Sequence, residues 1–278
     1  MSSLVRPPIA FAHRGARAHA PENTLEAFEL AFQQGADAIE CDLVPTSDGH
    51  LIIRHDNYLS TTTDIAEHSE FADRKTKDWY SEDFTLAEIK SLRAIERMPD
   101  LRPGSAKFDG EFLIPTVDEL LASEFANGKT LILEIKNGLF FAANNIPVVA
   151  ILKRALDASN YRDRGISLII ESFEYPILQQ ARRVLGDIAQ YVFLFQEPLE
   201  HSYLEQIQEN IDGISFDIAL VDRDYIGLAH SWGKPAYLWT AKAEDAEYSV
   251  DEYYAQLIAT EADGIFADQP DLLVSCLA

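Results

Sequence analysis

The stretch from Ile39 to Asp56, IECDLVPTSDGHLIIRHD, carries the strongest local signal in the chain. Apolar residues alternate with two acids between Ile39 and Val44, which predicts a strand. Glu40 and Asp42 are two positions apart, so both carboxylates should leave the same face of that strand. The first half of this stretch therefore places two acids side by side.

The second half of the stretch predicts a tight return. The segment 46–49, Thr-Ser-Asp-Gly, is turn chemistry, and its Asp-Gly pair is a strong signal for a two-residue hairpin loop. A second strand is expected from Leu51 to Arg54. With a two-residue loop, Asp42 would lie opposite His55. The hairpin thus predicts two carboxylates and an imidazole at one end, which is a candidate metal and acid/base site.

Composition sets limits on the class of protein. The chain has 278 residues, a net charge of −23 and a pI near 4.5, with 47% hydrophobic and 25% charged residues. These values are typical of a globular protein, and the acidity disfavours binding to nucleic acid or an anionic membrane. No apolar run approaches membrane-spanning length, so stable membrane insertion is not expected. Cys41 and Cys276 are the only cysteines, which excludes a disulfide scaffold.

The first residues, MSSLVRPPIAFAHRG, lack the long apolar core of a secretory signal. The sequence therefore predicts a cytoplasmic protein, although a trimmed secreted form remains open. The residues indicate no particular oligomeric state.

Strand-like and helix-like segments alternate along the chain. The first expected helix runs from Asn23 to Gln34, with Asn23 as its N-cap and Glu26 as capping-box partner. Further helices are expected to begin at Thr85 and Thr116. The remaining expected helices are Ile146–Ser159, Tyr175–Val184, Leu199–Glu209, Arg223–Ser231 and Val250–Thr260. Besides the two hairpin arms, the expected strands are Ile9–His13, Thr130–Lys136, Ile166–Glu171, Gln190–Phe195, Asp212–Asp217, Ala236–Thr240 and Asp263–Ala267.

Counting these strands indicates the fold. If the second hairpin arm only returns along the first, eight strands remain, most of them followed by a helix. This pattern predicts a (β/α)8 barrel forming one domain over residues 1–278, with an insertion at about 57–115. An open doubly wound sheet is the alternative. The barrel is favoured because polar residues recur at strand ends, which meet at one mouth in a barrel but spread along the edge of an open sheet.

Three of these polar residues predict a metal site. Glu134 repeats the arrangement of the hairpin acids, since it lies two positions before Lys136 on one strand face. Carboxylates from Glu40, Asp42 and Glu134 at one mouth form an all-oxygen site suited to one divalent cation, Ca²⁺ or Mg²⁺, which the residues do not distinguish.

Other side chains at the same mouth suit phosphate chemistry. His13 and His55 are the candidate catalytic acid and base, because imidazole titrates near neutral pH. Arg14 can hold a phosphate in a bidentate pair, and Lys136 can supply a second cation to the same anion. Trp239, at the end of a strand, can form a wall of a ligand pocket. These three are the predicted substrate-binding residues.

Taken together, the motifs resemble the glycerophosphodiester phosphodiesterase family over residues 9 to about 271. The resemblance rests on several short matches: His13-Arg14-Gly15, Pro21-Glu-Asn-Thr24, Gly35-Ala-Asp37, Ile39-Glu40-x-Asp42, Thr46-x-Asp-Gly49, His55-Asp56, Ile114-Pro-Thr116, Leu133-Glu134-Ile-Lys136, Glu171-Ser-Phe173, Trp239-Thr240 and Ala262-Asp-Gly-Ile265. Two positions depart from the family pattern. The family often has Arg-Thr-Thr where this chain has Ser60-Thr-Thr-Thr63, and Thr-Asp-x-Pro where it has Ala267-Asp-Gln-Pro270.

The resemblance implies a TIM barrel with a small inserted subdomain after the hairpin. It implies hydrolysis of a small glycerophosphodiester to glycerol 3-phosphate and an alcohol, without naming the alcohol. It also implies a divalent metal on Glu40, Asp42 and Glu134, with His13 and His55 as acid and base in an unassigned order. Water or the substrate's own 2-hydroxyl could be the nucleophile.

Two other functions are open on the sequence. One is a catalytically idle barrel that binds phosphodiesters. The other is a related phosphodiesterase that cleaves intact phospholipid. The complete set of histidines and acids argues against the first, and the polar insertion and strong acidity argue against the second.

Overall fold

The structure is a computed structural model that describes residues 7–278. Its single sheet closes into a barrel of eight parallel strands, with β1 pairing to both β9 and β2. The remaining strand, β3, runs antiparallel along β2. The strands are β1 Ile9–Ala12, β2 Ala38–Pro45, β3 Leu51–Ile53, β4 Thr130–Ile135, β5 Ser167–Ser172, β6 Gln190–Phe195, β7 Gly213–Asp217, β8 Ala236–Ala241 and β9 Gly264–Ala267. The predicted (β/α)8 barrel is confirmed, and the open sheet is excluded.

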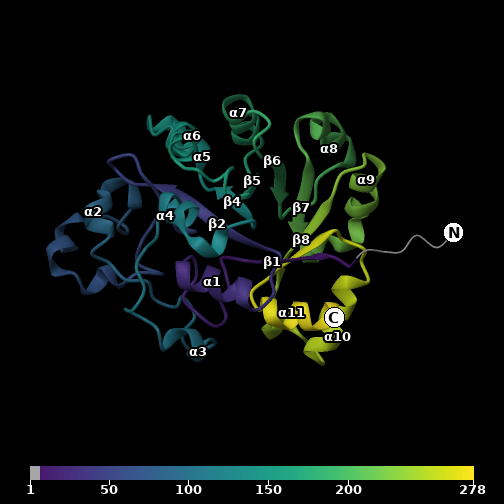
Figure 1. Cartoon of the computed structure of the whole chain (residues 1–278), viewed down its shortest axis with the longest axis horizontal. Helices are drawn as coiled ribbons and strands as arrows, with labels where there is room; N and C mark the ends of the chain where they lie inside the picture. Colours follow the sequence, from purple (N-terminus) through teal and green to yellow (C-terminus); the bar gives the residue numbers. More distant parts are fainter. Residues whose placement is uncertain (1–6) are drawn as a thin grey trace.

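Helices surround the barrel (Figure 1). They are α1 Leu25–Gln33, α2 Leu86–Ile89, α3 Pro103–Ala106, α4 Val117–Ala122, α5 Gly138–Ala143, α6 Val148–Ala158, α7 Tyr175–Leu185, α8 His201–Ile207, α9 Tyr225–Ser231, α10 Val250–Ile258 and α11 Pro270–Leu277. The capping boxes predicted at Thr85 and Thr116 both form. Helices α3, α5 and α11 were not predicted. In the part of the chain that the structure describes, no helix is both long and apolar enough to cross a bilayer.

The predicted hairpin register is wrong by one residue. Leu43 pairs with Ile53, and the backbone N–H of Arg54 donates to the carbonyl of Asp42 at 2.9 Å. The loop is therefore longer than Asp-Gly. It is closed by the hydroxyl of Thr46, which accepts from the backbone N–H of His50 at 3.0 Å. Consequently Arg54, rather than His55, lies opposite Asp42.

The predicted start of the first helix is also displaced. Thr24 is the N-cap of α1, and its hydroxyl accepts from the N–H of Ala27, so no capping box forms with Glu26. Asn23 has a positive φ of 60°. Its side-chain amide donates to Asp42 at 2.8 Å. The residue expected to cap the helix instead supports the acids on β2.

A long segment separates β3 from α4. It contains α2, α3 and three short 3-10 helices, and in Figure 1 α2 lies at the left of the view and α3 at the bottom. The segment touches the hairpin where the backbone N–H of Ile53 donates to the carbonyl of Pro115 at 2.8 Å. We call residues 57–115 the inserted segment. Its status as a separate subdomain stays a prediction.

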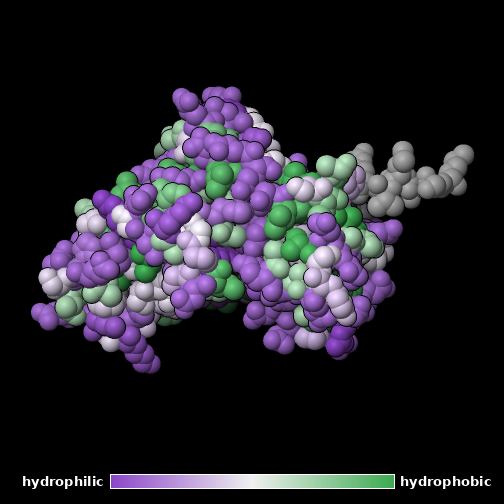
Figure 2. Space-filling view, turned by 90° about the horizontal axis from the view of Figure 1, so that it is seen from below, coloured by the Kyte–Doolittle hydropathy of each residue, from purple (hydrophilic) through white to green (hydrophobic). Residues whose placement is uncertain are grey.

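Apolar side chains fill the lower part of the barrel. They come from several strands and comprise Phe11, Ala38, Ile132, Ile169, Val192, Tyr237 and Phe266. Cys41, between Glu40 and Asp42 on β2, is buried in the largest core cluster, because strand alternation turns it to the opposite face from the two acids. Outside, the face in Figure 2 is mostly hydrophilic, with hydrophobic residues gathered toward the right of the view. The cytoplasmic location stays a prediction, and residues 1–6, on which it partly rested, lie outside the described residues.

Candidate active site

A cavity of about 710 Å³ opens at the carboxyl ends of the barrel strands. Strand alternation explains its polar lining, because interior side chains recur every second residue. His13 follows Phe11, Glu40 follows Ala38 and Glu134 follows Ile132, each two positions on, so a polar layer lies above the apolar one. The two-residue repeat of the strands therefore places these polar side chains at the barrel mouth.

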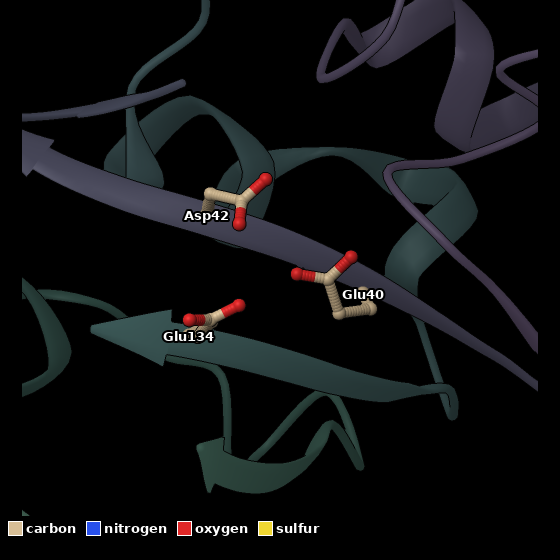
Figure 3. Close-up of side chains that lie close together, drawn as sticks. All are labelled: Glu40, Asp42 and Glu134. Atoms are coloured by element: carbon tan, nitrogen blue, oxygen red, sulfur yellow. The ribbon is translucent and has the colours of Figure 1, made fainter. Parts of the chain in front are cut away.

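The three predicted metal ligands converge at this cavity, which Glu40 and Glu134 line directly. Figure 3 shows Glu40 and Asp42 on β2 and Glu134 on β4 with their carboxylates turned toward one another. One oxygen from each lies within 4.8 Å of the others. Glu40 Oε1 and Asp42 Oδ1 are buried without a hydrogen-bond partner among the described residues. Orphaned carboxylate oxygens on a convergent set fit a hard divalent cation, so the cluster could hold a metal.

Electrostatics distinguishes these acids. Burial, followed by the charges of Asp42 and Glu134, raises the pKa of Glu40 well above its usual value. Burial also acts to raise the pKa of Asp42, but Arg14, His55 and Lys136 outweigh it and hold that pKa well below its usual value. Crowded carboxylates of this kind repel one another, and a cation between them would relieve that repulsion.

The two predicted phosphate-binding cations line the cavity and pair with its acids. Arg14 donates from Nη1 to Glu22 at 3.0 Å, and its Nε lies 3.2 Å from Asp42 Oδ2. Lys136 donates from Nζ to Glu134 at 2.8 Å and lies 3.5 Å from Asp42 Oδ1. Both are positioned to balance the acids, and their contact with phosphate stays a prediction.

His13 lines the cavity at the end of β1. Its Nδ1 lies 2.7 Å from Asp268 Oδ1, on the loop that follows the adjacent strand β9. A carboxylate acceptor fixes the tautomer with the proton on Nδ1, which leaves Nε2 free to accept a proton. Burial, and then the Arg14 cation, lower the pKa of His13 to about 4. The imidazole is therefore neutral near pH 7.

His55 is held in the same way. Its Nδ1 lies 2.8 Å from Asp56 Oδ1, and its ring also lines the cavity. Burial acts to raise the pKa of Asp56, but the bond from His55 and the charge of Arg97 lower it to about 2. Although the hairpin register differs from the prediction, His13 and His55 do reach one cavity.

Trp239 lies in the cavity wall, as predicted. Its ring packs edge-on against Phe173, with centroids 5.4 Å apart. The indole Nε1 is buried and has no hydrogen-bond partner among the described residues.

Three buried acids of the site have no role predicted from the sequence. Glu171 neighbours Glu134 across the β4–β5 pair, and burial raises its pKa well above the usual value. Asp268 orients His13, and Glu22 contacts three arginines. Strand alternation could have identified Glu171, and barrel closure could have placed Asp268 beside His13. Local sequence holds no signal for the partners of Glu22.

Comparison with known proteins identifies the fold and the family. Two solved structures superimpose on nearly the whole chain. A putative glycerophosphoryl diester phosphodiesterase from Silicibacter pomeroyi has a TM-score of 0.81 and 23% identity, covering 98% of this chain and 95% of its own. A phosphodiesterase from Oleispira antarctica, solved with the product sn-glycerol-3-phosphate, has a TM-score of 0.75 and 24% identity, covering 97% and 96%. At these identities the likeness shows the fold.

Relatives found by sequence, together with a family model, bear on family membership. A glycerophosphodiester phosphodiesterase from Caldanaerobacter subterraneus is 29% identical over 274 residues, covering 96% of each chain. Relatives from Arabidopsis thaliana and Haemophilus influenzae are 38% and 47% identical, but the matches span only 38% and 24% of their length. The model of the glycerophosphoryl diester phosphodiesterase family matches residues 13–272, which include all the residues of the cavity described above. The chain therefore belongs to the glycerophosphoryl diester phosphodiesterase family.

Proposed function

We propose that this protein hydrolyses glycerophosphodiesters to glycerol 3-phosphate and an alcohol, with one divalent cation on Glu40, Asp42 and Glu134. Family membership supports the reaction class. The observation that carries the proposal is the pairing of two carboxylate-held histidines with a convergent acid cluster at one cavity. An idle binding barrel has no need of both sets.

The two histidines divide the proton transfers. His13 is held at Nδ1 by Asp268, so its Nε2 can accept a proton, and we assign it the role of the base that takes a proton from the nucleophile. His55 then protonates the leaving alkoxide. Water and the substrate's own 2-hydroxyl both suit this scheme as nucleophile. Reaction in ¹⁸O-labelled water, with detection of any cyclic phosphate by ³¹P NMR, distinguishes the two.

The cationic groups balance charge at the phosphate. A cation on the three acids would supply charge stabilisation to the phosphoryl oxygens. Arg14 and Lys136 line the same cavity, and each already neutralises an acid of the cluster. With a cation on the carboxylates, both side chains are available to hold the remaining phosphate oxygens.

One observation favours the phospholipid-cleaving alternative. Leu139 and Phe140 of α5 follow Asn137 at the cavity and are 46% and 49% exposed, and Phe173 of the cavity wall is 37% exposed. An exposed apolar lip beside a phosphodiester site suits an acyl chain. Intact phospholipid therefore belongs in the test as a second substrate.

The experiment measures release of glycerol 3-phosphate from glycerophosphocholine, with and without EDTA, beside an intact phospholipid. We expect release from glycerophosphocholine, its loss on chelation, and recovery with added Ca²⁺ or Mg²⁺. Cleavage of the phospholipid alone would favour the alternative. Release that thorough chelation leaves unchanged would refute the metal part of the proposal.

A further inference from the structure

Two arginines of the inserted segment reach the carboxylates that hold the histidines. Arg97 Nη1 lies 2.7 Å from Asp56 Oδ2. Arg102 Nη2 lies 2.5 Å from Asp268 Oδ2. Neither arginine belongs to a barrel strand, yet each contacts the partner of one histidine. The inserted segment is thereby tied to both halves of the acid/base pair.

The two contacts follow one pattern. Asp56 accepts from His55 on Oδ1 and from Arg97 on Oδ2. Asp268 accepts from His13 on Oδ1 and faces Arg102 on Oδ2. Each carboxylate is therefore a bridge with a histidine on one oxygen and an arginine on the other. Held at both oxygens, a carboxylate cannot rotate without breaking a charged contact.

Each arginine has a second anchor that fixes its own position. Arg97 donates from Nη2 to Glu22 Oε1 at 2.9 Å. Arg102 donates from Nε to Glu244 Oε1 at 2.9 Å, in the loop after β8. With two ends fixed, each guanidinium acts as a rigid brace between the mouth of the barrel and a histidine-bearing carboxylate.

Burial strengthens the brace on His13. The Arg102 side chain is 2% exposed and that of Asp268 is 0% exposed. The corresponding pair of Arg97 and Asp56 is 23% and 11% exposed. Charged contacts gain strength where water is excluded, so the Arg102 brace should matter more. Arg17 also faces Asp268, at 3.7 Å, and can replace only part of this contact.

We propose that Arg97 and Arg102 are positioning residues, which orient His55 and His13 through Asp56 and Asp268. The inserted segment then completes the geometry of the acid/base pair. This inference rests on the proposed function, since it assumes that the two histidines act on substrate. It assigns neither arginine a contact with the substrate.

A purely structural role makes a different prediction. If the arginines only attach the segment to the barrel, replacing either one should loosen the whole mouth and disturb both histidines together. If each is a brace, Arg97→Met should disturb only His55, and Arg102→Met only His13. The matched control is Arg93→Met. Arg93 lies in the same segment, but within residues 7–278 its guanidinium donates only to the nearby backbone carbonyls of Lys90, Ser91 and Leu92.

The test combines kinetics with ¹⁵N NMR of the histidine rings in the full chain. We expect Arg97→Met and Arg102→Met each to lower kcat by about 10–100-fold, the usual effect of losing such an outer partner, with the larger loss in Arg102→Met and KM nearly unchanged in both. Each variant should shift the ring nitrogen signals of its own histidine only. Arg102→Lys keeps the charge and should recover part of the kcat, which keeps the test valid if Arg102→Met folds poorly.

Three results would overturn the inference. They are a kcat equal to that of Arg93→Met, equal disturbance of both histidines by either variant, and no recovery in Arg102→Lys over Arg102→Met. The proposed function fails separately. If His13→Ala and His55→Ala keep normal activity, the assumed chemistry is wrong. If those two variants lose activity while Arg97→Met and Arg102→Met keep the wild-type kcat, only the positioning roles are refuted.

Discussion

The polar network below the cavity depends on one buried acid, and its removal gives a measurable prediction. Glu22 is 3% exposed. Its Oε1 accepts from Arg14 at 3.0 Å and from Arg97 at 2.9 Å, and its Oε2 lies 2.7 Å from Arg17 Nη2. The change Glu22→Gln keeps the size of the side chain but removes the charge that faces three guanidinium groups.

Breaking a buried ion pair on one side costs about 3–5 kcal/mol, because it leaves the other charge uncompensated. For a chain of this size each kcal/mol shifts Tm by roughly 2–4 °C, so we expect Glu22→Gln to lower Tm by about 6–20 °C. Thermal unfolding followed by circular dichroism measures this. The control is Glu29→Gln on the exposed side of α1. A loss no larger than in the control would refute the assigned role of Glu22.

The other predictions concern pH, metal and substrate. Glu22 and Asp268 have lowered pKa values in the folded protein because their arginines outweigh burial, so their stabilisation is present above about pH 4 and is lost as pH falls further. Urea unfolding across pH 2–6 should show this, with a shallower loss in Glu22→Gln. Glu134→Gln should weaken binding of Ca²⁺ or Mg²⁺ by about tenfold or more in calorimetric titration, since it removes one ligand charge; unchanged affinity would exclude this acid from the site. Trp239→Phe keeps a ring but loses the unpartnered indole N–H, so KM should rise by about 2–10-fold if that group binds substrate, and an unchanged KM would count against it.

The fold was largely predictable from the sequence because the barrel strands and helices have strong local patterns of apolar and polar residues. The loop length of the hairpin could not be predicted from the local sequence. Asp48-Gly49 predicts a two-residue loop, but the Thr46 hydroxyl binds both the Asp48 carboxylate, at 2.7 Å, and the N–H of His50, which closes a longer loop. The hydrogen bonds of the Thr46 side chain within the turn thus accompany a strand register that differs by one residue from the predicted one.

The site was predictable where it follows the strand period. Glu40, Asp42 and Glu134 converge because side chains alternate along a strand and the parallel pairing of β2 with β4 places Asp42 beside Glu134. Partners brought by tertiary contact were not predictable. Asn23 was expected to cap a helix, yet its side chain binds Asp42, and Arg97 reaches Glu22 across 75 positions of chain. Such contacts depend on how the inserted segment lies on the barrel, which no local pattern encodes.

The most direct test of the central claim is the rate of glycerol 3-phosphate release by His55→Ala compared with His50→Ala. Both histidines belong to the hairpin region, but His55 lines the cavity whereas His50 is exposed in the loop. We predict that His55→Ala lowers kcat by about 10²–10⁴-fold, as expected for loss of an acid/base group, while His50→Ala retains the wild-type rate. A near-wild-type rate in a folded His55→Ala variant would contradict the account.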